Sequence, residues 1–179
     1  MATSLVSTGV QFPDATIQTT AKYALTSGTP VNTTSGTAFD FTGIPSWVKR
    51  ITVSLASVST NGTSNLILQL GSGSIETSGY TGYVARPYAS GTIYTGFVPG
   101  FVLSEVTNAA IVRAGSVVLT LMGSNIWIAN GASTDTVNSN GTGILCGTKT
   151  TAGTLDRIRI TTVSGTDIFD GGAINILYD

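Results

Sequence analysis

Apolar and polar residues alternate along several stretches of this chain, with the period of two that is typical of half-buried β-strands. In the stretch 51–56, Ile, Val and Leu occupy positions 51, 53 and 55, while Thr, Ser and Ala occupy the positions between them. The stretch 66–70 is apolar on both sides except at Gln69, which predicts a more central strand. Because Asn61-Gly62 separates the two stretches, the pattern predicts a hairpin pair around which the rest of the chain is built.

Further strand-like segments follow, separated by turns rich in Gly, Asn and Asp. They cover 101–106, 111–122, 125–129, 144–146, 157–163 and 174–178. Seven glycines between 71 and 100 argue against a long regular element there, and 130–141 has the composition of an exposed polar loop. About eight or nine strands without helical periodicity predict an all-β fold, an antiparallel β-sandwich of jelly-roll type.

The first 35 residues differ from the remainder. Their apolar residues are too few for a core of their own, and they end in a passage rich in Ser, Thr, Gly and Pro. We expect an extended N-terminal arm over 1–35, ordered by docking on another surface, and a β-sandwich domain over 36–179. A tail without a partner, or an edge strand of the same domain, are the alternatives.

Composition narrows the function. The chain has 179 residues, which suits one domain, and only 9% of them are charged, giving a net charge of −1. Without clustered Lys and Arg we expect no nucleic-acid partner. No apolar stretch approaches the roughly 20 residues that span a bilayer, and the N-terminus lacks a secretory signal pattern, so we expect no membrane insertion and release by lysis of the producing cell.

Catalytic chemistry has little support. Histidine is absent, which excludes a Ser-His-Asp or Cys-His arrangement, and no cofactor or metal-binding motif is present. We therefore expect no enzyme, no cofactor and no metal. Glu76 with Glu105 is the one pair of carboxylates we consider for glycoside hydrolysis. The single cysteine, Cys146, lies in an apolar run and is expected to be a small buried hydrophobe.

Four tyrosines offer the clearest binding chemistry: Tyr80, Tyr83, Tyr88 and Tyr94. Aromatic faces stack on the C–H-rich faces of sugars, and neighbouring hydroxyls and amides bond sugar hydroxyls without charge. The alternative is that these rings cover the sandwich edge or a subunit interface. Trp47 and Trp127 are expected in the core.

Two sets of residues resemble proteins of tailed bacteriophages. The arm, from Gly9 to Ala21, resembles the Phe-Pro-Asp-Gly-Thr-x-Gln-Thr-Thr segment of tail-fibre and appendage proteins, with Ala15 in place of Gly. The segments 41–51, 59–64, 69–71 and 75–80, with the closing 174–179, are similar to a domain that recurs in phage and prophage virion proteins. The resemblance implies a homotrimeric virion protein, assembled in the host cytoplasm, whose arm attaches to other virion proteins. The candidate attachment residues are Phe12, Pro13, Asp14, Ile17 and Gln18.

The leading hypothesis is a non-enzymatic structural protein of a tailed-phage virion, a short tail fibre or appendage whose β-domain contacts the host surface, with glycans as the expected receptor. With about 35 residues before the β-domain, at most roughly 3.3 Å each, a long shaft is excluded. A capsid decoration protein that stabilises the head is the alternative. A glycan-degrading enzyme is the remotest reading.

Overall fold

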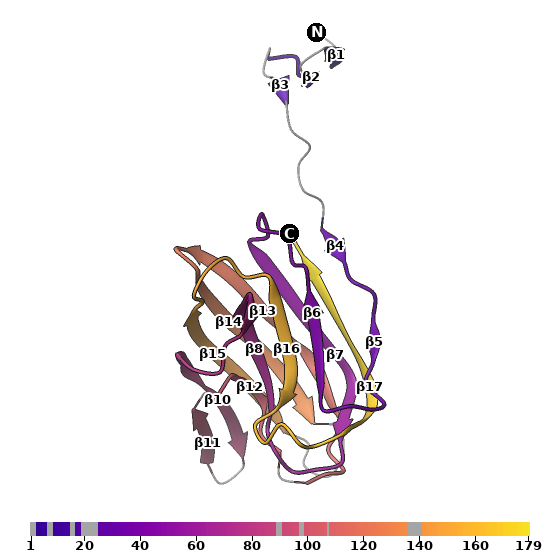
Figure 1. Ribbon diagram of the computed structural model, residues 1–179, viewed down its shortest axis with the longest axis vertical. Helices are drawn as coiled ribbons and strands as arrows, with labels where there is room; N and C mark the ends of the chain where they lie inside the picture. Colours follow the sequence, from indigo (N-terminus) through magenta and orange to yellow (C-terminus); the bar gives the residue numbers. More distant parts are fainter. Residues whose placement is uncertain are drawn as a thin grey trace.

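The computed structural model describes residues 3–6, 9–14, 17–18, 25–88, 91–96, 99–106, 108–135 and 141–179. Within these ranges the chain is all-β, without helix, and its strands pair in antiparallel sheets (Figure 1). The all-β prediction is thereby confirmed. The β-sandwich of jelly-roll type and the trimer stay predictions. We call the described residues from 25 onward the β-body.

A small three-stranded sheet lies in the predicted arm. It consists of β1 (Ser4–Val6), β2 (Gly9–Gln11) and β3 (Ile17–Gln18), paired in that order among the described residues. Pro13 and Asp14 form a turn after β2, as Pro-Asp predicts. The expected arm therefore contains regular structure.

A nine-stranded sheet runs through the β-body. Its order over the described residues is β11 (Gly91–Gly96), β10 (Tyr80–Tyr88), β15 (Thr142–Thr150), β14 (Ile126–Asp135), β13 (Arg113–Gly123), β7 (Arg50–Thr60), β17 (Phe169–Tyr178) and β4 (Thr26–Ser27), with β5 (Val31–Asn32) also on β17. A five-stranded sheet contains β12 (Phe101–Ser104), β8 (Leu66–Ser72), β16 (Arg157–Thr162) and β6 (Ala38–Thr42), with β9 (Ser74–Ile75) on β8.

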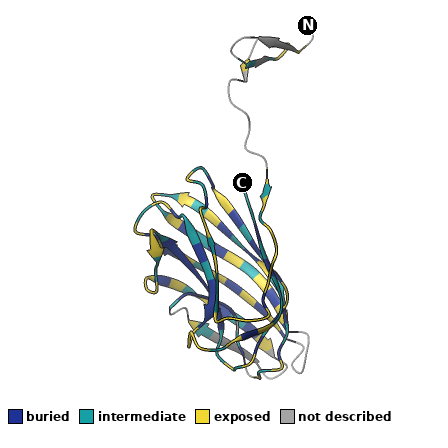
Figure 2. Ribbon diagram, turned by 45° about the vertical axis from the view of Figure 1, so that its right-hand side comes forward, coloured by how far each residue is buried: buried dark blue, intermediate teal, exposed yellow. Residues whose placement is uncertain are grey.

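The buried side chains of both sheets form one core. Ile51, Val53 and Leu55 of β7 contribute from one sheet, and alternate residues of the strand are more exposed. Leu68 of β8 and Ile158 of β16 contribute from the other. Figure 2 shows this alternation of buried and exposed positions along the strands. The arrangement agrees with the period-two pattern.

The predicted hairpin of 51–56 with 66–70 is wrong. The strand β7 pairs with β13 and β17, whereas β8 pairs with β12, β16 and β9, so the two belong to different sheets. The connection through Asn61 crosses from one sheet to the other. Side-chain alternation specifies that a strand has a buried face and does not specify its partner, so both pairings satisfy the same pattern.

Two segments predicted as loops are largely strands. Glycines at 82 and 91 did not prevent β10 and β11 from pairing as a hairpin between Tyr83 and Gly96. Likewise, β14 continues through Asn130-Gly131 to Asp135, while 136–140 of that expected loop lie outside the described residues. Gly131 fits because an added Cβ would lie 2.3 Å from the Ser116 carbonyl oxygen. The glycine here marks a close backbone approach inside the sheet.

The last part of the predicted arm belongs to the edge of the nine-stranded sheet. Thr26 and Ser27 pair with Tyr178 and Leu177, and the Gly28 amide donates to the Ile176 carbonyl over 2.8 Å. Thr33 is fully buried, and its hydroxyl donates to the Gly171 carbonyl over 2.7 Å. The edge-strand alternative therefore holds for residues 25–33, and the attachment role of the earlier residues stays a prediction.

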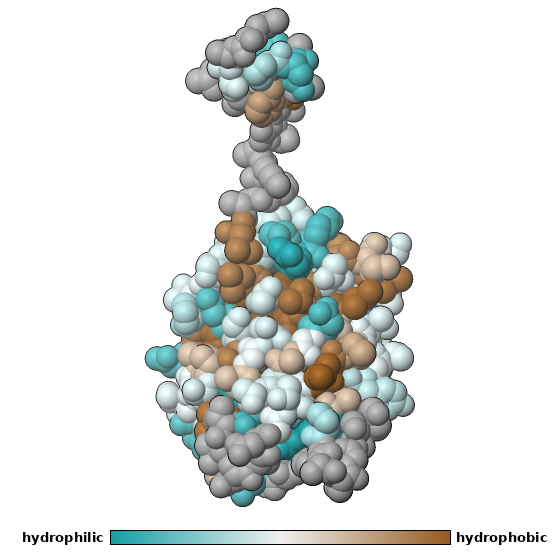
Figure 3. Space-filling model, turned by 180° about the vertical axis from the view of Figure 1, so that it is seen from behind, coloured by the Kyte–Doolittle hydropathy of each residue, from teal (hydrophilic) through white to brown (hydrophobic). Residues whose placement is uncertain are grey.

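The surface carries few charges. Viewed from behind, it shows mostly weakly polar side chains with apolar ones gathered in the upper half of the β-body (Figure 3). Met122, Ile126 and Ile144 are among the exposed hydrophobic residues of the nine-stranded sheet. Cys146 is exposed as well, so the prediction that it is buried is wrong. It takes an outward position of β15, between the buried Leu145 and the half-buried Gly147.

Candidate functional site

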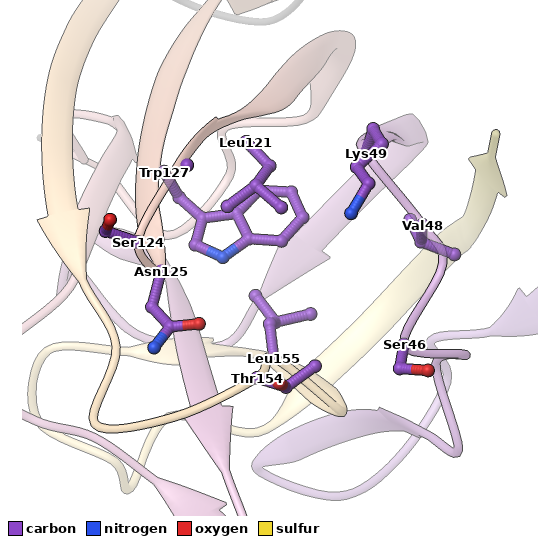
Figure 4. Close-up of a pocket in the computed structure, with 10 residues that line it drawn as sticks. Ser46, Val48, Lys49, Leu121, Ser124, Asn125, Trp127, Thr154 and Leu155 are labelled. Carbon is purple, nitrogen blue, oxygen red and sulfur yellow. The ribbon is translucent and has the colours of Figure 1, made fainter.

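A pocket of about 260 Å³ opens at the end of the β-body that carries the C-terminus. Three chain segments line it: the loop between β6 and β7, the β13–β14 hairpin, and the loop between β15 and β16 (Figure 4). Its lining residues are Ser46, Val48, Lys49, Leu121, Gly123, Ser124, Asn125, Trp127, Thr154 and Leu155. The lining combines an aromatic ring and aliphatic side chains with hydroxyls, one amide and one ammonium, the mixture typical of small-ligand sites.

The β13–β14 turn places two polar residues at the pocket. Ser124 and Asn125 form a two-residue turn between Gly123 and Ile126, and both have positive φ, 48° and 62°. Two consecutive positive φ values are the mark of a type I′ hairpin turn, which favours Gly and Asn. Ser124 has a Cβ and occupies this region at a cost of order 1–3 kcal/mol. Such backbone strain clusters at functional sites.

Hydrogen bonds hold the three segments together. The Thr151 amide donates to the Asn125 carbonyl over 3.0 Å, which ties the turn to the β15–β16 loop. The Ile44 amide donates to the Asp156 carbonyl, also over 3.0 Å, which ties that loop to the β6–β7 loop. The pocket walls are thus joined by backbone bonds independent of any ligand, so the site is preformed.

Trp127 forms the aromatic wall. The residue is 3% exposed, and its indole Nε1 is buried with no acceptor in the described structure. Figure 4 shows this nitrogen turned toward the space between Asn125 and Leu155. An indole N–H is only a donor, and a buried donor without a partner costs about 1–3 kcal/mol. A ligand with an acceptor atom in the pocket would remove that cost.

Lys49 is the single charged residue that lines the pocket. Its backbone is fixed on both sides, because its amide donates to the Asp179 carbonyl and its own carbonyl accepts from the Leu121 amide, each over 2.8 Å. Its ammonium has no ion pair or hydrogen bond with any described residue. Asn125 likewise keeps its side-chain amide free of described partners.

The structure removes Tyr80 from the predicted tyrosine cluster. Tyr80 is 8% exposed, its ring packs edge-on against Phe101, and its hydroxyl accepts from the Leu70 amide and donates to the Glu76 carbonyl. Burial raises the pKa of this phenol well above its ordinary value. Tyr80 is therefore a core residue and offers no face to a sugar, which corrects its assignment as a candidate binding residue.

Tyr83 lies on the opposite face of β10 and is 60% exposed. Its ring lies beside Gly96 of the neighbouring strand. The backbones of Tyr88 and Tyr94 belong to β10 and β11, while their side chains lie outside the described part of the structure. Of the four candidates, Tyr83 is the one that the structure shows open to a ligand.

Glu76 and Glu105 are engaged in different places. The Glu76 carboxylate pairs with Lys149 and accepts from the Ala152 amide, whereas the Glu105 carboxylate accepts from the Thr95 hydroxyl. The partners of the two carboxylates lie opposite different residues of β10: Lys149 is paired with Tyr80, and Thr95 is paired with Val84. Tyr80 and Val84 are four residues apart along the strand. That offset is roughly 13 Å at about 3.3 Å per residue. The structure does not bring the two carboxylates together as the candidate pair requires.

A buried charged cluster lies at the far end of β10. Arg86, Arg113 and Asp135 are at most 4% exposed, and Arg86 Nη2 lies 3.0 Å from Asp135 Oδ2. Burial lowers the pKa of Arg113 to about 10, so its guanidinium remains protonated at neutral pH. An added Cβ at Gly141 would lie 2.3 Å from Arg86 Nε, so the chain packs directly on the guanidinium. We call these three residues the charged cluster.

Among the predicted attachment residues, Phe12 is 41% and Ile17 44% exposed, on either side of the Pro13–Asp14 turn. Both apolar side chains are accessible at their small sheet. Gln18 pairs with Val10 through its backbone, and its side chain is outside the described structure. These positions fit an attachment role without testing it.

No protein-family model, curated protein or solved structure matches this chain. Within the described ranges there is also no helix with the length and hydropathy to cross a membrane, and no group of three or more potential metal ligands. The pocket is therefore interpreted from its own chemistry.

The sequence pattern did not predict this site. It placed Trp127 in the core, correctly by burial, and did not indicate a role for the donor edge of the ring. The remaining lining residues come from positions scattered between 46 and 155. The one local signal is the Gly-Ser-Asn sequence at 123–125, whose turn type becomes evident once the register is known.

Proposed function

We propose that this chain is a non-enzymatic structural protein of a tailed-phage virion, a short appendage whose β-domain binds a host-surface saccharide in the Trp127 pocket. The pocket carries the proposal: a buried aromatic wall, a free indole donor and a rim of hydroxyls and an amide on preformed loops. The phage context comes from the sequence resemblance. The jelly-roll sandwich and the homotrimer are parts of the same proposal.

The chemistry of the lining suits a sugar. The electron-rich face of an aromatic ring attracts the polarised C–H groups of a pyranose. Ser46, Ser124 and Thr154 provide hydroxyls that donate and accept, and Asn125 provides both functions in one side chain. A volume of about 260 Å³ is close to the lower end of the roughly 300–1,000 Å³ of small-molecule sites, which suits one monosaccharide.

The test follows the two indole N–H signals of the full-length protein by NMR during titration with a panel of methyl glycosides. Trp47→Phe assigns the signals and serves as the matched control. A sugar in the pocket shifts the Trp127 signal, with affinity on the order of millimolar for a ligand this small. Trp127→Phe keeps a ring and removes the donor, so we expect about two- to tenfold weaker binding, measured by the anomeric proton shifts of the sugar.

A second variant protects the test against misfolding. Asn125→Ala shortens a half-buried turn side chain and leaves in place the Asn125 carbonyl that accepts from the Thr151 amide. We expect it to weaken binding by a similar factor while the melting temperature stays within a few degrees of the parent. Unchanged Trp127 signals across the whole panel would refute saccharide binding at this pocket.

One observation favours the capsid decoration alternative. The pocket opens at the end of the β-body that carries β4. Thr26 of β4 pairs with Tyr178, and the Lys49 amide at the pocket donates to the carbonyl of the adjacent Asp179. A virion protein held by the arm would approach this same end. Immunogold labelling of particles distinguishes the two functions: a few copies at the tail support the appendage, and hundreds on the head support decoration. Light scattering of the purified protein tests the trimer.

A further inference from the structure

We infer that the ligand of the Trp127 pocket is an acidic monosaccharide whose carboxylate is bound by Lys49. This inference rests on the proposed function and specifies its substrate class. It starts from the charges around the pocket, which are distributed unevenly.

Two acidic residues beside the pocket, Asp179 and Asp156, are already engaged. Asp179, whose carbonyl accepts from the Lys49 amide, has its carboxylate bound by Arg50 through Nε at 2.9 Å and Nη2 at 2.7 Å. Asp156, next to Leu155 of the lining, is bound by Arg157 through Nε at 2.8 Å and Nη2 at 3.1 Å. That hydrogen bond lowers the pKa of Asp156, so it remains a carboxylate held by its arginine.

Lys49 is left without a counter-charge in the described structure. Five ion pairs occur among the described residues, and none of them includes Lys49. Figure 4 shows its ammonium directed from the rim toward the pocket interior. The pocket therefore presents a full positive charge to whatever occupies it.

The Trp127 indole N–H is a second donor at the pocket and also favours a ligand rich in acceptor atoms. The buried Trp127 N–H requires an acceptor, and an ammonium also offers only donors. A carboxylate has two acceptor oxygens, and its bond to the ammonium is charge-assisted and stronger than the bond that a hydroxyl would form there. The sugar ring attached to it would use the aromatic face and the Asn125 amide. A neutral hexose satisfies the ring contacts and leaves the ammonium unpaired.

The expected preference is modest because Lys49 is exposed to solvent. Exposed ion pairs contribute roughly 0.2–1 kcal/mol, which is up to about a fivefold change in affinity. Salt screens such a pair, with a Debye length of about 10 Å at 0.1 M and about 3 Å at 1 M. The preference for the acid should therefore decrease as salt is added.

The experiment compares matched acidic and neutral ligands on the full-length protein. The pairs are methyl glucuronoside with methyl glucoside, methyl galacturonoside with methyl galactoside, and methyl N-acetylneuraminate glycoside with its methyl ester. Binding is followed by the Trp127 indole signal at low and high salt. We expect at least one acid to bind about three- to fivefold more tightly than its neutral partner at low salt.

Variants assign the preference to Lys49. Lys49→Met should weaken binding of the acid more than binding of its neutral partner and so abolish the preference, and Lys49→Arg should retain the preference. Arg159→Gln removes one positive charge from an exposed pair with Asp40, away from the pocket, and is the charge-matched control. It should preserve the preference.

The outcomes separate the two proposals. Equal binding of acid and neutral sugar, unaffected by Lys49→Met, overturns the acidic class and leaves the saccharide pocket standing. Absence of any Trp127 response overturns both. A preference that Lys49→Met does not alter also overturns the inference, because the charge would then be recognised elsewhere.

Discussion

The two ends of the β-body differ in how their polar side chains are placed: at one end they are buried against one another, and at the other they line a pocket. At the charged cluster, Arg86, Arg113 and Asp135 are buried against one another and against Gly141, with no space for an added methyl group. At the pocket, Trp127, Asn125 and Lys49 line open volume, and the buried Trp127 Nε1 has no acceptor among the described residues. Where burial is complete, charges must be compensated within the chain; where a cavity is kept, donors stay available for a ligand.

The charged cluster should therefore dominate stability. Asp135→Asn leaves two buried guanidinium groups without their carboxylate, and we expect it to lower the free energy of unfolding by about 3–5 kcal/mol. The matched control is Asp40→Asn, which removes the carboxylate of the exposed pair with Arg159 and should cost less than about 1 kcal/mol. Urea denaturation followed by circular dichroism measures both. Equal effects of the two substitutions would show that burial does not distinguish the two pairs.

A second substitution separates core from binding among the tyrosines. Tyr80→Phe removes the hydroxyl that accepts from the buried Leu70 amide, so we expect about 1–3 kcal/mol of destabilisation. Tyr83→Phe, on the exposed side of the same strand, should stay within about 0.5 kcal/mol. Neither should alter the Trp127 indole response to sugars. A loss of sugar binding in Tyr83→Phe would move the site from the pocket to the outer face of β10.

The β13–β14 turn gives the smallest expected effect. Asn tolerates positive φ better than Ser, so Ser124→Asn should raise the free energy of unfolding by up to about 1 kcal/mol. Thermal denaturation tests this, with Ser46→Asn, at another exposed position of the pocket rim, as the control that should change little. A destabilised Ser124→Asn protein would mean that the strain is compensated by a contact of the Ser124 side chain.

The all-β class could be predicted from the sequence because the alternation at positions such as Ile51, Val53 and Leu55 indicates a strand with one buried face. The strand partners could not be predicted. The side-chain pattern of β7, like that of β8, would be the same whether the two strands paired with each other or lay in different sheets. The glycines between 71 and 100 also led to a wrong prediction of irregular structure. In β10, Gly82 pairs with Gly147 of β15, because tertiary packing outweighs the low strand preference of glycine.

The candidate site was less predictable than the fold. Tyr80 and Tyr83 differ by an odd number of residues, so the strand that carries them sends their rings to opposite faces. Once β10 is a strand, Tyr80 and Tyr83 cannot belong to one binding surface. The Trp127 pocket depends on loops separated by up to about a hundred residues, and its key property is a donor that finds no partner. A donor without an acceptor can be recognised only when the positions of all surrounding residues are known.

The seam between β17 and the segment 25–33 also has a mechanical meaning. If the arm holds the particle and the β-body holds a cell, tension enters at residue 25 and meets the short β4 pairing first, then β5, and finally the buried Thr33 anchor. Peeling those nine residues would lengthen the tether by roughly 30 Å at about 3.3 Å per residue. The β-sheet core would remain intact meanwhile, so this seam would act as an extensible coupling that yields under load before the binding end is disturbed.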